Sequence, residues 1–237
     1  MKIKIIFNNE SSDQRFSSGW GFSCLIGENL LFDTGEEESY LIRNFKALDS
    51  DVSALKDIVI SHDHWDHTGG LPAALINNKG AHVYGCPGFS TEFRNTVREL
   101  HGNLIELNGK TEIQQNIFST GEIPSMYNGY PMPEQSLVIH SNNGLTIITG
   151  CAHPGIVNII KIVKDQFPGE IIYAVLGGFH LHKTSKREIE VISRKFKEMG
   201  VLKVGPAHCS GGVAERIFKD LYGDDFLQIV TGTVLRV

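Results

Sequence analysis

The sequence predicts a mixed α/β fold, an α/β (α+β) domain in which two sheets stack face to face with helices outside, giving four αββα layers. Two halves of the chain support this prediction, because each opens with antiparallel strands and continues with strands and helices in alternation. No Pro-, Gly- or Ser-rich linker separates the halves. We therefore expect residues 1–237 to form a single domain.

The composition is that of an ordinary globular protein. Of the 237 residues, 41% are hydrophobic and 21% are charged, which argues against a disordered or coiled-coil chain. The formal net charge of −5 argues against a nucleic-acid partner. No apolar run is long enough for a bilayer and the N-terminus reads as a strand rather than a signal peptide, so we expect a cytoplasmic protein without a membrane partner. The four cysteines show no CxxC spacing and are expected to be reduced.

The first half of the chain is expected to begin as antiparallel sheet and to contain three helices. Alternating or continuous apolar residues predict strands at 1–7, 21–27, 29–33, 57–61, 81–85, 104–107 and 113–119. Helical spacing of apolar residues predicts helices at 37–48, 68–77 and 89–100. The strand at 57–61 delivers the chain directly to His62.

The second half repeats this pattern in outline. Its predicted strands are 137–140, 145–149, 171–176, 202–205, 226–230 and 233–237. Its predicted helices are 155–167, 185–199 and 212–222. The segment 123–136 contains Pro124, Pro131 and Pro133, so we interpret it as a loop that lines an apolar pocket mouth or packs on a sheet edge.

The strongest functional signal is an HxHxDH run at residues 62–67, directly after an apolar strand. Two imidazoles separated by one residue can converge on one metal ion, while a carboxylate and an imidazole one turn later can point at a second ion. The alternative is a surface histidine cluster or a capped helix start with Asp66 as N-cap, and either one predicts no further histidines at the ends of other strands.

Three further histidines do follow predicted strands. They are His153 after 145–149, His180 after 171–176 and His208 after 202–205. Parallel strands share one carboxyl edge, so these loops are expected to bring distant histidines into one cleft. Each histidine alone would more often be a packing or surface residue, but together with the HxHxDH run they favour metal ligation.

The chain resembles the metallo-β-lactamase superfamily over nearly its whole length. The resemblance rests on Phe32-Asp33-Thr34-Gly35, on the HxHxDH run, on His153 and on His208 before the last long helix. It implies two metal sites, whose ligands are His62, His64 and His153 for one ion and Asp66, His67 and His208 for the other. It also implies that Asp33 orients the loop rather than binding metal.

One position departs from the family pattern. Most dinuclear members place a bridging Asp after the strand that here ends in Gly177-Gly178-Phe179-His180, where this sequence offers no carboxylate. His180 is therefore a candidate replacement ligand or a substrate-side acid, with packing as the alternative. The departure leaves the occupancy of the second metal site open.

Longer motifs resemble a narrower branch, typified by the archaeal dihydropterin ribofuranosylaminobenzene 5'-phosphate synthase of methanopterin biosynthesis. These motifs are residues 149–158, 177–181 and 206–211. The resemblance implies a metal-dependent hydrolase or transferase acting on a phosphorylated small molecule. A phosphodiesterase or lactonase of the same fold, or a metal-binding sensor without turnover, stays as an alternative. A homo-oligomer is compatible with the sequence.

The chemistry expected of such a site is metal-assisted. Divalent cations lower the pKa of bound water from about 16 toward 7, which supplies a nucleophile without Ser or Cys. Imidazoles dominate the ligand set, so two Zn²⁺ ions are expected, with Mn²⁺ or Fe²⁺ as alternatives. Asp66 or the metal-bound hydroxide is the candidate base, and His180 is the candidate acid. Ser210, Gly211 and Gly212 open a helix with Ser210 as N-cap, which predicts a phosphate site.

Two cysteines adjoin expected ligands, because Cys151 lies two residues before His153 and Cys209 follows His208. A thiolate binds zinc strongly. Each cysteine, however, already neighbours a histidine that fills the ligand role. We therefore interpret both cysteines as small buried residues that pack beneath the loops, with thiolate ligation as the alternative.

Overall fold

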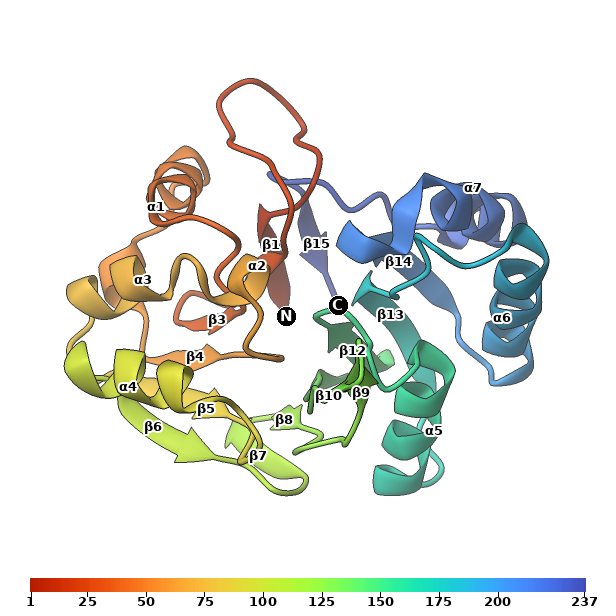
Figure 1. Ribbon diagram of the computed structural model, residues 1–237. Helices are drawn as coiled ribbons and strands as arrows, with labels where there is room; N and C mark the ends of the chain where they lie inside the picture. The colour runs from red at the N-terminus through yellow and green to blue at the C-terminus, as the bar shows by residue number, and fades with distance from the viewer. The chain divides into compact units, whose positions relative to one another are not determined.

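The computed structural model describes residues 1–237, and the chain divides into two compact units. The first unit contains Met1–Asn108 and Val230–Val237, and the second contains Gly109–Ile229. Each unit has one main sheet with α-helices packed on it (Figure 1). The mixed α/β class is confirmed, while the single domain over 1–237 stays a prediction.

A seven-stranded sheet forms the centre of the first unit, in the order β15-β1-β2-β3-β4-β5-β6. Its strands are β1 Lys2–Phe7, β2 Ser23–Ile26, β3 Leu30–Phe32, β4 Asp57–Val59, β5 His82–Gly85, β6 Asn103–Glu106 and β15 Val234–Arg236. Strands β15 to β3 pair antiparallel, whereas β3 to β6 pair parallel. The loops after β3 and β4 therefore leave the same edge of the sheet.

The helices of the first unit are α1 Glu38–Ala47, η1 Val52–Ala54, α2 Trp65–Thr68, α3 Leu71–Asn77 and α4 Thr91–Glu99. Apolar side chains of α1 and α3, among them Leu41, Phe45 and Leu75, form one core with Ile58 and Val83 of the sheet. This core buries one face of each amphipathic helix.

The helix expected at 68–77 is instead two helices, α2 and α3, and the first begins at Trp65 and so includes Asp66 and His67. Gly69 and Gly70 lie between the two helices because the backbone of residues 34–36 passes too close for a side chain. A Cβ on Gly69 would lie 2.0 Å from the carbonyl oxygen of Glu36, and one on Gly70 would lie 2.4 Å from that of Thr34.

The second unit has a six-stranded sheet in the order β14-β13-β12-β11-β8-β7. Its strands are β7 Thr111–Gln114, β8 Ile117–Ser119, β11 Leu137–Ser141, β12 Gly144–Thr149, β13 Ile172–Gly178 and β14 Lys203–Ala207. Strands β12, β13 and β14 are parallel neighbours, so the loops that follow them share one carboxyl edge.

The helices of the second unit are α5 Ile156–Gln166, α6 Lys186–Glu198, η2 His208–Ser210, α7 Gly211–Tyr222 and η3 Gly223–Asp225. Helix α6 begins at a capping box, in which Ser185 accepts from the backbone of Glu188 and the Glu188 carboxylate accepts in return from the backbone of Ser185. None of the helices in either unit is both long and apolar enough to cross a membrane.

Three segments of the second unit differ from the prediction. The strand expected at 113–119 is a hairpin of β7 and β8, which turns at Asn116 with φ +63°. Residues 226–230 form no strand, and only Phe226 bridges to Val204. The proline-rich loop contains a short hairpin of β9 Met126–Tyr127 and β10 Tyr130–Pro131.

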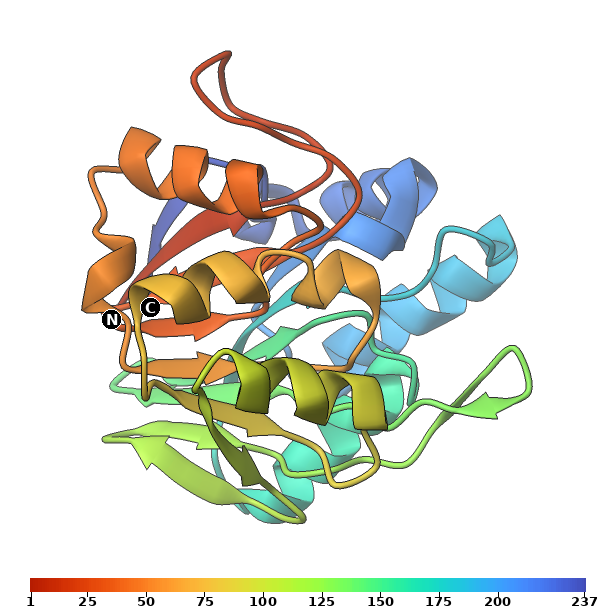
Figure 2. The ribbon, with the colours of Figure 1, turned by 60° about the vertical axis from the view of Figure 1, so that its left-hand side comes forward.

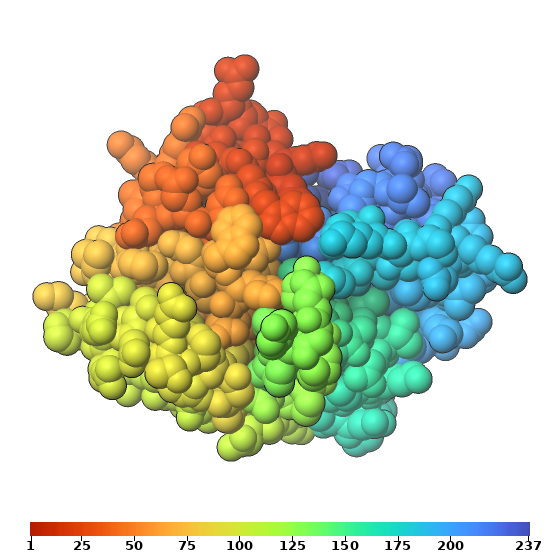
Figure 3. Space-filling model, viewed as in Figure 1, coloured from red at the N-terminus to blue at the C-terminus, as the bar shows by residue number.

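The β9–β10 hairpin turns at Asn128-Gly129, both with positive φ, as a two-residue type I′ turn requires. The hairpin projects from its unit in Figure 2 and forms a green ridge in Figure 3. Its side chains Met126 and Tyr130 are 61% and 73% exposed. The exposed position of the hairpin explains why apolar periodicity did not reveal it.

Three phenylalanine rings form the centre of the second unit's core. Phe179 follows β13, Phe196 lies on α6 and Phe218 lies on α7, and each is at most 1% exposed. The ring centroids are 5.0 to 5.6 Å apart, the spacing of favourable aromatic pairs. His180 is the next residue after Phe179, so the core fixes the backbone position from which His180 extends.

We predict that Phe218→Ala lowers the free energy of unfolding by about 3–5 kcal/mol, because the buried ring leaves a cavity. The matched control is Val213→Ala on the same helix, where the side chain is 44% exposed and the change should stay within about 0.5 kcal/mol. Urea denaturation measures both. Equal effects of the two substitutions would contradict the assignment of Phe218 to the core.

Candidate functional site

The first unit gathers the four HxHxDH side chains on the loop after β4 and on α2. His62, Asp66 and His67 are buried, and His64 is half-buried. Nε2 of His62 lies 3.1 Å from Nδ1 of His64. Two nitrogens bound to one tetrahedral zinc ion are about 3.3 Å apart, as follows from Zn–N bonds of about 2.0–2.1 Å. His67 Nε2 lies 3.7 Å from the Asp66 carboxylate.

Asp33, which follows β3, holds this loop in place. The side chain is fully buried and accepts three hydrogen bonds: from the Ser61 backbone N–H at 2.7 Å, from the Ser61 hydroxyl at 2.8 Å and from Nδ1–H of His67 at 2.7 Å. A carboxylate that accepts from Nδ1–H fixes the tautomer of His67 and leaves Nε2 as the nitrogen that can bind a cation. These contacts support a positioning role for Asp33.

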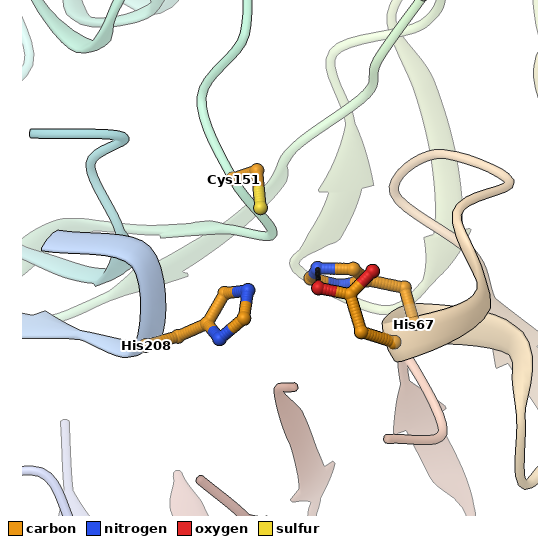
Figure 4. Close-up of side chains that lie close together, drawn as sticks. His67, Cys151 and His208 are labelled. Carbon is orange, nitrogen blue, oxygen red and sulfur yellow. Dashed lines mark ion pairs between the residues drawn. The ribbon is translucent and has the colours of Figure 1, made fainter. Parts of the chain in front are cut away.

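The second unit presents three histidines at the shared carboxyl edge of β12, β13 and β14. His153 lies in the loop after β12, His180 two residues after the end of β13, and His208 at the start of η2 after β14. Cys151, His153 and His180 have ligand atoms within 4.8 Å of one another, and Cys151 and His208 also lie within that distance. Figure 4 shows Cys151 and His208 on their two loops, and it also shows His67 on α2.

Backbone strain is concentrated at these residues. Eight non-glycine residues have positive φ, and four of them are Asp33, Ala152, His180 and His208. Each such conformation costs roughly 1–3 kcal/mol and persists only where surrounding contacts hold it. Strained positions of this kind often accompany functional sites, so the backbone itself points to these loops.

The imidazole of His180 is hydrogen-bonded to the Cys209 side chain, and one of its two ring nitrogens has no partner. A hydrogen bond with the Cys209 side chain raises the pKa of His180, and burial opposes that shift. Burial raises the pKa of Cys209, but its interactions with Cys151, His208 and His180 outweigh burial and bring this pKa well below its usual range. Nδ1 of His180 is buried without a hydrogen-bond partner, which suits a nitrogen that binds a cation.

Sequence reasoning missed Glu134, which lies in the proline-rich segment interpreted as a loop. The side chain is fully buried, and its carboxylate accepts backbone N–H groups from Cys151 at 3.0 Å, Ala152 at 2.8 Å and His153 at 2.7 Å. Glu134 therefore shapes the loop that presents His153. No local signal could have revealed this role, because a lone glutamate beside prolines is ordinarily exposed.

The capping hydrogen bond expected of Ser210 at the start of α7 is not formed, and the phosphate site expected there stays a prediction. Ser210 is the residue before α7, but its side chain makes no capping hydrogen bond. Its hydroxyl is fully buried and instead accepts from the Phe179 backbone N–H at 3.0 Å. Ser210 thus links two loops of the same edge. Gly211 adopts φ +78° against the backbone of His182, and Gly212 is exposed.

A cavity of about 440 Å³ opens beside His153 and His180. Its lining includes Lys161 of α5 and Lys195 of α6, and its walls include apolar side chains such as Ile156. Cavities of this size fit small-molecule ligands. The two ammonium groups make neither a hydrogen bond nor an ion pair, and this favours an anionic ligand.

The donor set of both units fits a transition-metal ion. Imidazole nitrogens predominate and are accompanied by one carboxylate in the first unit and by a thiol in the second. Such donors suit Zn²⁺ or Fe²⁺ better than Mg²⁺ or Ca²⁺, which prefer oxygen ligands.

We predict that Glu134→Gln weakens metal binding by about 10–100-fold, because an amide N–H would face the backbone donors of the His153 loop. The free energy of unfolding of the metal-free protein should fall by about 1–3 kcal/mol. Glu112→Gln is the control, since Glu112 accepts one backbone N–H at an exposed hairpin. Metal titration and urea denaturation of both variants test this, and unchanged metal affinity in Glu134→Gln would contradict it.

Comparison with known proteins places this geometry in a family. The profile described as the metallo-beta-lactamase superfamily matches residues 23–208. The 7,8-dihydropterin-6-methyl-4-(beta-D-ribofuranosyl)-aminobenzene-5'-phosphate synthase of Methanocaldococcus jannaschii is 28% identical over 250 aligned positions, which cover 89% of this chain and 85% of that protein.

Solved structures agree with this match. The crystal structure of Tm1679, a metal-dependent hydrolase of the beta-lactamase superfamily, has a TM-score of 0.84 and 33% identity and covers 100% of this chain and 99% of that chain. YhfI of Bacillus subtilis, a metallo-beta-lactamase fold protein, has a TM-score of 0.67 at 13% identity with 99% of both chains covered, which shows the fold alone. The predicted fold is thereby confirmed, and the chain belongs to the metallo-β-lactamase superfamily.

Proposed function

We propose that this chain is a metal-dependent enzyme that performs hydrolysis or group transfer on a phosphorylated small molecule. The observation that carries the proposal is that buried and half-buried imidazole donors gather on loops that buried carboxylates hold in place. The proposed ligands are His62, His64 and His153 for one divalent ion and Asp66, His67 and His208 for a second. Zn²⁺ is the proposed ion, because the donors are mainly imidazoles.

Two observations support a phosphorylated substrate. The similar synthase of Methanocaldococcus jannaschii is named for a 5'-phosphate compound. Lys161 and Lys195 are among the residues that line the cavity beside His153 and His180, and their positive charges favour an anion. Gly212 at the start of α7 is exposed, and its backbone N–H could bind the same anion.

Side chains of the second unit would shape the reaction. The rings of His153 and His180 are 4.5 Å apart, and the ring of Tyr127 lies 4.8 Å from the first and 5.6 Å from the second. Tyr127 thus covers both imidazoles from the β9–β10 hairpin. We propose His180 as the group that gives a proton to the leaving atom and Asp66 as the group that accepts one. Bound divalent cations would polarise the substrate and activate water.

We predict that purified protein contains about two equivalents of zinc and that a chelator abolishes its turnover of phosphodiester or phosphomonoester substrates. His64→Ala and His153→Ala should each lose metal and activity. His140→Ala is the control, because His140 forms only an exposed ion pair with Glu170. Elemental analysis and a substrate screen that includes lactones measure these outcomes.

Each other outcome points to a different function. If only lactones are turned over, the substrate is a lactone and not a phosphorylated compound. Stable metal binding without any turnover would favour a sensor or binding protein. Absence of metal even after reconstitution would overturn the proposal.

We predict that His180→Ala lowers turnover by about 10²–10⁴-fold, the usual contribution of a general acid. His182→Ala is the matched control, since its ring is a neighbour of His180 at 5.4 Å and makes a hydrogen bond to the Cys209 carbonyl. Metal content of both variants separates a ligand from an acid. Full metal content together with full turnover in His180→Ala would show that the proposed role is wrong.

A further inference from the structure

Cys151 lies in the middle of the histidines of the second unit. Its Sγ is within 4.8 Å of the ligand atoms of His153 and His180, and also within 4.8 Å of that of His208. In the proposed function, His153 and His208 bind different metal ions. Cys151 is therefore near a ligand of each ion.

We propose that the thiolate of Cys151 is a metal ligand, shared between the ion bound by His153 and the ion bound by His208. This inference rests on the proposed function for the two ions. It replaces our sequence-based interpretation of Cys151 as a packing residue. The residue is 4% exposed, so it is screened from bulk water as a structural or ligating cysteine would be.

The backbone around Cys151 is built to fix the direction of the side chain. The N–H groups of Cys151, Ala152 and His153 all donate to the Glu134 carboxylate. Ala152 adopts φ +62° between the other two residues, a conformation that a non-glycine residue adopts at a cost. As a result, the ligand atoms of Cys151 and His153 lie within 4.8 Å of each other.

Charge provides an independent reason for a thiolate at this position. Among the residues proposed to bind the two divalent ions, Asp66 supplies the single anionic group. The loop after β13, residues 179–185, contains no carboxylate that could supply a second negative charge. A thiolate adds the missing negative charge and binds Zn²⁺ at about 2.3 Å.

The neighbouring Cys209 fits this role less well. Its Sγ belongs to none of the groups of ligand atoms that lie within 4.8 Å of one another, whereas the Sγ of Cys151 belongs to two of them. The sulfur packs against Gly178, where an added Cβ would lie 2.7 Å from it. Cys209 thus fills space beneath the loops, as predicted for both cysteines, and it provides a matched control in the same layer.

The test uses the full-length protein loaded with Co²⁺, which replaces Zn²⁺ and gives a near-ultraviolet charge-transfer absorption when a thiolate binds it. Wild type and Cys209→Ser should show this absorption, whereas Cys151→Ser should lose it. Loss of a group that only supports a metal ligand lowers metal affinity by roughly 10–100-fold. The zinc affinity of Cys151→Ser should fall by more than this, because the substitution removes a ligand. Cys151→Asp should shift the metal preference from Zn²⁺ toward Mn²⁺, because a carboxylate is a harder ligand.

Two outcomes would overturn the inference: wild type with bound cobalt that shows no thiolate absorption, or the same absorption in Cys151→Ser. The first needs no variant, so a folding defect in Cys151→Ser leaves the inference falsifiable. Failure of the proposed function is distinguishable, because it would appear as absent turnover in a protein whose cobalt spectrum still shows the thiolate.

Discussion

A buried carboxylate that accepts several N–H groups from a neighbouring loop is the interaction on which the candidate ligands of each unit depend. Burying an ionised carboxylate is costly unless hydrogen bonds replace its water. Asp33 obtains them from Ser61 and His67, and Glu134 obtains them from Cys151, Ala152 and His153. Because each carboxylate needs all of these donors, the loop that supplies them can adopt few other conformations.

The sheets determine where those loops begin. In each unit the strands that precede candidate ligands are parallel neighbours, so their loops leave one edge. Strained conformations at Asp33, Ala152, His180 and His208 then direct the side chains. The packing free energy of the cores offsets the cost of these strained conformations. Rigid placement of the ligands is thus a property of the whole unit rather than of a single motif.

The lack of a carboxylate after β13 is the position at which this sequence departs from the family pattern, and the contacts of Glu134 bear on it. His180 stands where a carboxylate is usual, and a histidine supplies a donor atom without a negative charge. Cys151, brought close by the Glu134 contacts, is the nearby group that can supply that charge as a thiolate. With the proposed thiolate, the ligand set would contain a softer donor, which would favour Zn²⁺ over Mn²⁺.

The sequence alone predicted much of the fold and most of the candidate ligands. Apolar periodicity located β12, β13 and β14 and the helices that follow them, and the HxHxDH spacing singled out the first unit's cluster, because both signals lie within a few adjacent residues. Periodicity failed where local turn chemistry decides the structure, as at Asn116 and in the β9–β10 hairpin at Asn128-Gly129.

Only the tertiary structure decided the contacts of Glu134 and Ser210 and brought Cys151 close to the histidines of the second unit. Glu134 lies 17 to 19 positions from the N–H groups that it accepts, and the Ser210 hydroxyl meets a backbone group 31 positions away. Burial and hydrogen bonding across such separations depend on how strands pair, which residue identity at one position does not reveal. The sequence determined which donors are available, and the packing of the chain decided which of them face one another.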